Sequence, residues 1–383
     1  MNCCLEAGLV LAEGVLSIRS VITYPLSVPQ PAASGRTGFV NGLVVEIVTA
    51  DGRSGFGETC SPVSPRATAR IVEDALAPVL LGADESDIGA LWQRMRQALV
   101  APVAGAGAEA VSAVDIALWD LLGQKLSAPI HALLAGHGRD RLPAYASFIG
   151  WIDDRRAVAE AERAMRLGFR QLKVKLSPPL DAAIARVTLM RQTVGEGFGL
   201  VADPNGSFDY VEAVQLARRL AELGYLWLEE PIDPSDLPGL VELNRHGFLP
   251  LAAGENEFGP RGALALAATG AIGVLQPDCG RIGGITGFSR AVTAAATLGV
   301  TFAPHHAGGA IKATAALHLA AALPGFRVME CSLLRTALHD DLTRAPTAHP
   351  SLLDSDGCLP VPQGPGLGID VNRETFARLA IHR

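Results

Sequence analysis

Aromatic side chains are scarce in this sequence. They make up 5% of its 383 residues, whereas hydrophobic types together make up 49%. We therefore expect a core built mainly from Ala, Leu and Val. There is no basic stripe, and the net charge of −7 at pH 7 gives no reason to expect nucleic acid as a partner. A run of eighteen uninterrupted apolar residues is also missing, so we expect no membrane-spanning helix.

Cysteine pairs with the spacing of metal or redox sites are absent too. The six cysteines lie at positions 3, 4, 60, 279, 331 and 358, and none forms a C-x-x-C motif. Thiols spread in this way are typical of a reduced, cytoplasmic enzyme. The first residues are apolar, but Glu6 and Glu13 interrupt them and no basic segment precedes them, so we expect no signal peptide.

The first part of the chain predicts an α+β region over residues 1–137. Residues 15–60 alternate between apolar and polar types, and the turn sequence ADGRSG interrupts them, which indicates an antiparallel meander. Residues 66–136 then predict helices. The clearest is EAVSAVDIALWDLLGQKL, which has apolar residues at helical spacing and is followed by Gly136 as a stop signal.

From about residue 140 onward, short strand-like runs alternate with amphipathic helical segments. Strict alternation of this kind favours parallel strands, and eight such strands with seven helices between them indicate a (β/α) barrel over residues 138–355. The Gly- and Pro-rich tail, 356–383, is expected to fold back on the first region. The predicted strands span 142–147, 171–176, 199–205, 226–231, 251–256, 274–278, 300–305 and 327–331.

Three carboxylates stand at the ends of consecutive predicted strands. Asp203, Glu229 and Glu255 are each 26 residues apart, so they should lie at one level of the barrel mouth. Converging carboxylates repel one another unless a cation compensates them, and an all-oxygen set selects a hard ion such as Mg²⁺. A single acidic residue at a strand end is usually a surface or capping residue, but three in register favour a metal site. Glu230 should face the opposite way from Glu229 and support it.

Two further strand ends predict proton-handling groups. Asp278 and His305 are 27 residues apart on neighbouring strands, and a carboxylate beside an imidazole fixes its tautomer and raises its basicity. A histidine in the sequence PHHAGG could also be an ordinary loop residue, but the neighbouring aspartate favours an acid/base pair. His306 is the rival candidate and is expected to face away.

The stretch QLKVKL places Lys173 and Lys175 on one face of a predicted strand. The carboxylates on the next strands would help to keep Lys173 charged, and Lys173 could also meet a substrate carboxylate. Lys175, next to another cation, is expected to have a lowered pKa, which suits a general base. A hard cation, a lysine base and a His–Asp pair together suit the removal of a proton α to a carboxylate, which gives an enediolate.

At this point the sequence resembles the enolase superfamily, and within it the mandelate racemase subgroup of the mandelate racemase/muconate lactonizing enzyme family. The resemblance covers nearly the whole chain. It rests on DIALWDLLGQKLSAPIHALLAG, LKVKL, ADPNGSFD, LEEP, AGENEFGP, QPDCGRIGGITG, FAPHH and VMECS. It implies an α/β fold, a modified TIM barrel (β/α)₇β with an α+β capping domain formed by residues 1–137 and the tail 356–383.

The resemblance also implies roles for individual residues. Mg²⁺ would be bound by Asp203, Glu229 and Glu255. Lys175 would be one base with Lys173 in support, and His305 with Asp278 would form the second acid/base. Glu330 would donate a hydrogen bond to the substrate carboxylate, so its pKa should be raised, and Ser147 and Asn205 would add polar contacts.

Three functions stay open at this stage. The first is dehydration of a sugar acid, which the glycine-rich run after His305 favours. The second is racemisation or epimerisation of a 2-hydroxy acid, because both opposed bases are present. The third is a non-catalytic, metal-dependent binding protein. Arg281 stands where lysine is common in the family, which leaves the substrate open.

The expected partner is a small-molecule carboxylate, with neither nucleic acid nor a membrane involved. Specificity should reside in the capping domain, where Arg36 in the loop 24–42 could reach a distal group of the substrate or could simply be an exposed arginine. The family tendency predicts a homo-oligomer, either a dimer or an octamer.

Overall fold

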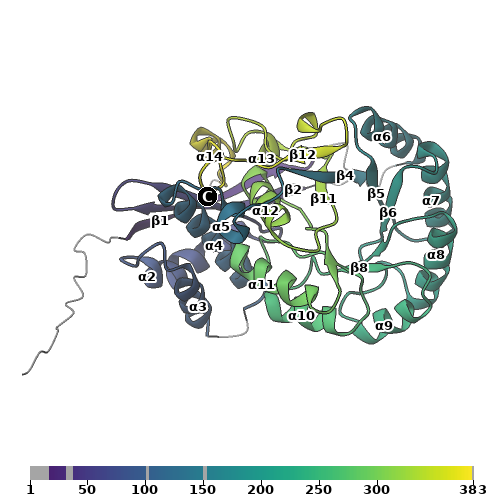
Figure 1. Ribbon diagram of the computed structural model, residues 1–383, viewed down its shortest axis with the longest axis horizontal. Helices are drawn as coiled ribbons and strands as arrows, with labels where there is room; N and C mark the ends of the chain where they lie inside the picture. Colours follow the sequence, from purple (N-terminus) through teal and green to yellow (C-terminus); the bar gives the residue numbers. More distant parts are fainter. Residues whose placement is uncertain (1–16, 32–37, 101–102, 150–152, 382–383) are drawn as a thin grey trace, which may run out of the picture.

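A computed structural model describes residues 17–31, 38–100, 103–149 and 153–381. At the N-terminal end, three strands form an antiparallel sheet in the order β1-β2-β3, as the alternating pattern predicts. Helices pack against this sheet (Figure 1). The strands are β1 (Ile18–Pro29), β2 (Phe39–Thr49) and β3 (Ser54–Cys60), and the helices are α1 (Pro65–Ile71), α2 (Ala77–Leu80), α3 (Ile88–Ala98), α4 (Ala106–Lys125) and α5 (Ile130–Ala135), with a π-helical turn at Val72–Leu76.

The long helix α4 lies directly against β3 because β3 has no side chains at two contact positions. A Cβ atom at Gly55 would lie 2.3 Å from the carbonyl oxygen of Ala117, and one at Gly57 would lie 1.8 Å from that of Ala113. Most residues of α4 are buried, so this helix joins the sheet on one side to the rest of the molecule on the other.

The second part of the chain is a curled parallel sheet, and it confirms the predicted α/β barrel. Within the described residues, eight strands follow one another in the order β4 to β10, with β11 beside β4. A parallel bridge between Phe302 and Phe326 connects β10 to the segment that leads into β11. The strands are β4 (Arg141–Ile149), β5 (Gln171–Lys175), β6 (Gly199–Asp203), β7 (Leu228–Glu229), β8 (Leu251–Ala253), β9 (Val274–Leu275), β10 (Thr301–Phe302) and β11 (Met329–Ser332).

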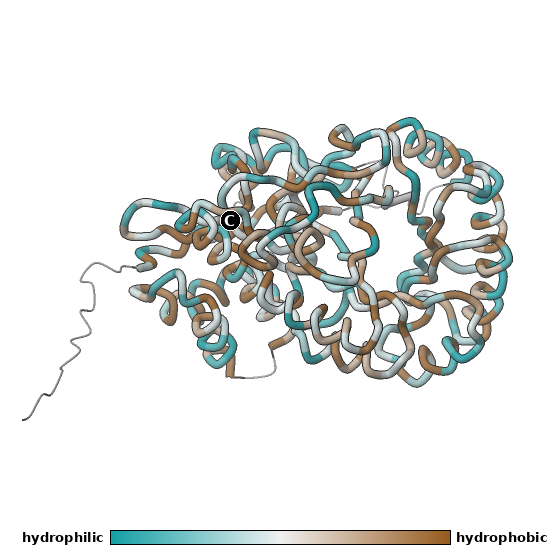
Figure 2. Tube along the Cα trace, viewed as in Figure 1, coloured by the Kyte–Doolittle hydropathy of each residue, from teal (hydrophilic) through white to brown (hydrophobic). Residues whose placement is uncertain are grey.

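A ring of helices surrounds the curled sheet (Figure 1). The helix α8 buries an apolar stripe that includes Ala213, Leu216 and Leu220, and hydrophilic residues lie along the outer edge of α7 and α8 (Figure 2). Local signals fix where helices begin, such as the capping box of Asp209 and Glu212 at α8. The helices are α6 (Asp154–Arg166), α7 (Leu180–Val194), α8 (Tyr210–Glu222), α9 (Leu237–Arg245), α10 (Pro260–Ala268), α11 (Gly284–Ala296) and α12 (Ala310–Ala322).

Apolar side chains fill the interior of the barrel below its mouth. One buried layer consists of Tyr145, Val201, Trp227, Ala252, Val274, Ala303 and Val328. The amine of Lys173 lies 5.7 Å from the centre of the Tyr145 ring, so this charged side chain is in direct contact with the apolar layer. The barrel is therefore closed below, and chemistry is confined to the mouth where the strands end.

The C-terminal segment returns to the N-terminal sheet. Its elements are α13 (Ala337–Asp340), β12 (Cys358–Pro360) and α14 (Arg373–Leu379), with a 3₁₀ turn at Pro350–Leu352. β12 pairs with β4, whereas α14 packs on β1, where Phe376 lies against Tyr24 and Arg373 forms an ion pair with Glu46. Among the described residues, no helix is long and apolar enough to cross a bilayer.

Candidate active site

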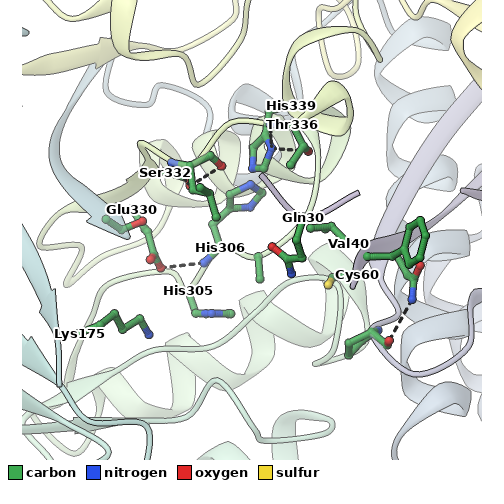
Figure 3. Close-up of a pocket in the computed structure, with 17 residues that line it drawn as sticks. Gln30, Val40, Cys60, Lys175, His305, His306, Glu330, Ser332, Thr336 and His339 are labelled. Atoms are coloured by element: carbon green, nitrogen blue, oxygen red, sulfur yellow. Dashed lines mark hydrogen bonds between the residues drawn. The ribbon is translucent and has the colours of Figure 1, made fainter. Parts of the chain in front are cut away.

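A cavity of about 240 Å³ lies between the barrel mouth and the N-terminal sheet. Figure 3 shows Lys175, His305 and Glu330 together at one end of this cavity, whereas the ring of His306 turns toward Ser332, Thr336 and His339. The N-terminal part of the chain contributes Gln30, Val40, Asn41 and Cys60 to the lining. The cavity is thus built by both parts of the fold.

The two lysines of β5 meet the carboxylates of the next strands. The register pairs Lys175 with Asp203, and the Lys175 amine bonds to the carboxylate of Asp203 and, at 2.9 Å, to Asn205 Oδ1. Lys173 is fully buried, and its amine lies 2.8 Å from Glu229 Oε1 and 3.2 Å from Asp203 Oδ2. The sequence-predicted lysines and two of the predicted metal ligands therefore form one buried ionic cluster.

Burial and the neighbouring charges shift the pKa values of the carboxyl groups in this cluster. Burial raises the pKa of Glu229, and the charge of Asp203 adds to the shift, which brings it to about 8. Burial likewise raises the pKa of Asp203, but Lys175 and Lys173 outweigh burial and hold it well below its usual range.

The third predicted ligand, Glu255, lies at the edge of the same cluster. Its Oε2 atom is buried and makes no hydrogen bond, although His305 Nε2 lies 3.1 Å away without hydrogen-bond geometry. Arg281 donates to the backbone oxygen of Glu255 at 3.1 Å and to Asn256 Oδ1 at 3.0 Å, which holds this loop. Glu255 Oε2 thus forms an ion pair with the His305 imidazole but has no hydrogen bond among the described residues.

The donor set fits a hard divalent cation. All three predicted ligands offer carboxylate oxygens, Glu255 Oε2 is buried without a hydrogen bond among the described residues, and burial together with the charge of Asp203 raises the pKa of Glu229. With the side chains as they stand, no three His, Cys, Asp or Glu residues among those described converge as a metal-binding group. Asp203 and Glu229 instead pair with the lysines.

Two non-glycine residues at these strand ends adopt the left-handed backbone conformation. Asn205 has φ +49° and Glu230 has φ +36°. Such residues cost roughly 1–3 kcal/mol each, and they persist where the surrounding structure holds them. Asn256 Nδ2 donates to both carboxylate oxygens of Glu230, at 3.1 and 3.0 Å. Glu230 accordingly braces the loop that carries Glu255.

The predicted histidine–aspartate pair is present. His305 Nδ1 lies 2.8 Å from Asp278 Oδ2. Burial lowers the pKa of His305, but Glu255, the bond to Asp278 and Glu330 outweigh burial and raise it to about 9. His305 therefore carries a proton at neutral pH in this structure, and its Nε2 atom turns toward Glu255 and the cavity end that holds Lys175.

Glu330 lies at the same end of the cavity, but the expected raised pKa is wrong. Burial raises the pKa of its carboxyl group, whereas Lys173, His305 and Lys175 lower it more strongly, to about 2. Its Oε1 atom lies 3.2 Å from the Lys173 amine, and its Oε2 atom accepts from the backbone N–H of His306 at 3.0 Å. Glu330 is therefore ionised here: it pairs with Lys173 and accepts a hydrogen bond from His306 instead of donating one.

The remaining predicted contacts have mixed outcomes. Ser147 lines the cavity, whereas Asn205 contacts the Lys175 amine without being part of the lining. Arg36 lies outside the described residues.

Two family models match most of this chain. Residues 19–135 match the family described as "Mandelate racemase / muconate lactonizing enzyme, N-terminal domain", and residues 156–375 match "Enolase C-terminal domain-like". The chain belongs to the mandelate racemase/muconate lactonizing enzyme family. It is therefore an enzyme of the enolase superfamily, of the type that comprises lyases and isomerases.

Relatives within the family cover most of the chain. D-galactarolactone cycloisomerase of Agrobacterium fabrum is 31% identical over 93% of this chain and 96% of its own length. Arabinonate dehydratase of Saccharolobus solfataricus is 30% identical over 87% of this chain and 89% of its own. A racemase from Streptomyces coelicolor A3(2), solved with bound magnesium, has a TM-score of 0.86 and 30% identity over 95% of this chain and all of its own.

Sequence reasoning missed two residues that contact the predicted strand-end carboxylates. Gln276 donates to Glu229 Oε2 at 2.8 Å, and Lys312 donates to both carboxylate oxygens of Asp278. His306 turns away from His305 as expected, yet it lines the cavity and neither of its ring nitrogens has a partner. The signal for Lys312 was present, because a single lysine inside the apolar helical run AIKATAALHLAAA needs a buried counter-charge.

Proposed function

We propose that this enzyme removes the proton α to the carboxylate of a sugar acid and eliminates water from the adjacent carbon. One observation carries the proposal. Lys175 and the His305–Asp278 pair lie at one end of a single cavity, next to a buried cluster of carboxylates. The similarity to an arabinonate dehydratase supports elimination from a sugar acid.

The chain's own residues divide the work. Lys175 takes the α-proton, and Lys173, held charged among three carboxylates, supports it as a fixed positive charge. Asp203, Glu229 and Glu255 would hold Mg²⁺. When bound, Mg²⁺ supplies positive charge that stabilises the enediolate as it develops. Ser147 offers a hydroxyl to the substrate from the cavity wall.

His305 completes the elimination as a proton donor. The Cα–H bond breaks and its electron pair enters the enediolate. Collapse of the enediolate then breaks the bond between Cβ and the hydroxyl oxygen. Protonated His305 donates its Nε2 proton to that oxygen, which leaves as water, and the resulting enol tautomerises to a 2-keto acid.

Two isomerase reactions use the same first step. The similarity to a cycloisomerase favours elimination of a ring oxygen, which opens the ring and leaves the product mass unchanged. The similarity to the magnesium-bound racemase favours return of a proton to the opposite face of the α-carbon. Both need the same two proton-handling groups, so the fate of the enediolate distinguishes the three reactions.

The test is a library of sugar acids and sugar lactones incubated in D₂O with Mg²⁺ and the purified enzyme. We expect one or more compounds to lose the α-proton signal and to give a product that is lighter by one water and reacts with semicarbazide. An isomer of unchanged mass would identify a cycloisomerase, and a compound of inverted configuration would identify a racemase. If every compound keeps its α-proton with the wild-type enzyme, or if Lys175→Ala and His305→Asn turn over a substrate as fast as the wild type, the proposed reaction and residue roles are wrong.

Further parts of the proposal come from the sequence and the family. A capping domain of residues 1–137 and 356–383 would set specificity over a barrel of residues 138–355, with a small carboxylate as the ligand. We also propose a homo-oligomer, a dimer or an octamer, in the cytoplasm. Light scattering of the purified enzyme measures the oligomeric state directly.

A further inference from the structure

Lys312 is a fully buried charge behind the histidine–aspartate pair. It lies in the first turn of α12, is 0% exposed, and its amine lies 2.8 Å from Asp278 Oδ1 and 2.6 Å from Asp278 Oδ2. Burying an ammonium group costs several kcal/mol unless its partners compensate it. A lysine retained in such a place therefore has to be explained by what it does for Asp278.

The surroundings of Lys312 leave room for its side chain and little else. A Cβ atom at Gly280 would lie 2.7 Å from Lys312 Cδ, and one at Gly308 would lie 2.9 Å from Lys312 Cε. Gly308 has φ +144°, a conformation that glycine adopts without strain. Part of the glycine-rich sequence after His305 thus serves to place this lysine.

The N-terminal sheet fixes the helix that carries Lys312. Glu58 of β3 accepts hydrogen bonds from the backbone N–H groups of Gly309 and Lys312, the latter at 3.0 Å. The next residue, Thr59, donates to the backbone oxygen of Gly280 at 2.6 Å. Two adjacent residues of β3 therefore hold both segments between which the lysine side chain runs.

Lys312 helps to fix the orientation of the Asp278 carboxylate. Asp278 Oδ1 accepts from the Gly280 N–H at 2.7 Å and from Lys312, and Oδ2 accepts from Lys312 and lies 2.8 Å from His305 Nδ1. Rotation of the carboxylate would break several of these contacts together. The imidazole is consequently held by Nδ1, with Nε2 turned toward the reacting end of the cavity.

We infer that Lys312 is a positioning residue for the reaction: it holds the Asp278 carboxylate, and through it the His305 ring, at an orientation that β3 of the N-terminal sheet sets through Glu58. The inference rests on the proposed role of His305. It assigns to the N-terminal sheet a part in aligning the acid/base pair, in addition to lining the cavity.

The test compares Lys312→Met with His305→Asn in the magnesium-loaded enzyme, using a sugar acid that the library identifies. We expect Lys312→Met to lower kcat by about 100-fold or more, because small displacements of a proton-handling group have effects of this size, with KM changed far less. We also measure exchange of the substrate α-proton in D₂O. If His305→Asn keeps this exchange, Lys312→Met should keep it, and if His305→Asn loses it, Lys312→Met should lose it. The matched control is Thr314→Val, which removes a buried polar contact of the same helix to Thr347 and should keep kcat within about 3-fold.

A double variant separates positioning from folding. Lys312→Met leaves Asp278 without its buried partner and could unfold, whereas Asp278→Asn/Lys312→Met removes both charges. We expect the double variant to fold and to have the kcat of Asp278→Asn, because Lys312 acts only through Asp278. A double variant that is more than about 3-fold slower than Asp278→Asn overturns the inference.

A spectroscopic readout does not depend on turnover. In protein labelled with ¹⁵N-histidine, the Nδ1 signal of His305, assigned by its loss in His305→Asn, should change in Lys312→Met and stay unchanged in Thr314→Val. An unchanged signal overturns the inference while the proposed function stands. If His305→Asn itself turns over substrate like the wild type, the proposed function falls, and this inference falls with it.

Discussion

Lys173 and Lys175 lie two residues apart on β5, but their surroundings differ. Lys173 is fully buried and pairs with Asp203, Glu229 and Glu330. Burial lowers its pKa, yet these carboxylates outweigh burial and hold the pKa well above its usual value. Lys175 reaches the cavity. One lysine therefore serves mainly as a fixed counter-charge, and the other is placed where a substrate can meet it.

Replacing Lys173 with Met should destabilise the protein strongly. Removal of one partner leaves buried carboxylates uncompensated, so we expect the free energy of unfolding to fall by about 3–5 kcal/mol. Lys125→Met, at an amine that is 37% exposed and pairs with Glu85 and Asp84, should cost less than about 1 kcal/mol. Urea unfolding in the presence of a chelator measures both. Equal losses for the two variants would contradict a compensating role for Lys173.

At the scale of elements, the contact between β3 and α4 depends on glycine. A Cβ atom at Gly57 would lie 1.8 Å from the backbone oxygen of Ala113, and backbone atoms cannot give way as a flexible side chain can. We expect Gly57→Ala to lower the free energy of unfolding by more than about 2 kcal/mol.

The control for this contact is Gly89→Ala in α3, where an added Cβ atom meets nothing within 4 Å. Alanine is the better helix former, so this variant should be stabilised by about 0.5–1 kcal/mol. Thermal unfolding followed by circular dichroism compares the two. If Gly57→Ala melts at the wild-type temperature, the close packing of α4 on β3 is wrong.

The helices and strands that could be predicted from the sequence are those with a clear periodic pattern of hydrophobic residues. Runs such as QLKVKL and GLVADPN, separated by amphipathic helices, located the barrel strands and hence the strand-end carboxylates, lysines and His305. The contact between Lys312 and Asp278 spans 34 residues and joins a helix to a loop, so no periodic pattern reports it. The ionised state of Glu330 was also unpredictable, since it depends on the approach of Lys173 on β5 across the intervening strand β4.

At the scale of the whole molecule, buried acids of α4 connect the two parts of the fold. Asp115 accepts from the backbone N–H of Thr286 at the start of α11 at 2.9 Å. Asp120 accepts from the N–H groups of Phe56 in β3 and Leu367 in the C-terminal segment. Each carboxylate therefore contributes to the junction between segments that lie far apart in sequence.

Stability should decline with pH because of Asp115. Burial raises the pKa of its carboxyl group from 3.8 to about 7, more than the bond from Thr286 lowers it. The native state then binds this proton more tightly than the unfolded chain. The stabilisation is present below the unfolded pKa and is lost as pH rises toward 7, by up to about 1.4 kcal/mol per pH unit.

Urea unfolding between pH 4 and 8 checks this prediction. We expect Asp115→Asn to show a shallower decline than the wild type over that window. Asp51→Asn is the control, because hydrogen bonds from Thr49 and Arg53 lower the pKa of this exposed carboxyl group to about 2, so it titrates below the window. An identical slope in the wild type and Asp115→Asn would show that the native state does not hold this proton.

The most direct test of the site is a crystal structure of the enzyme grown with Mg²⁺ and a sugar acid. We expect one ion bound by carboxylate oxygens of Asp203, Glu229 and Glu255, with the substrate α-carbon between Lys175 and His305. A structure in which these three carboxylates point apart and the ion, if bound at all, lies elsewhere would contradict the proposed chemistry.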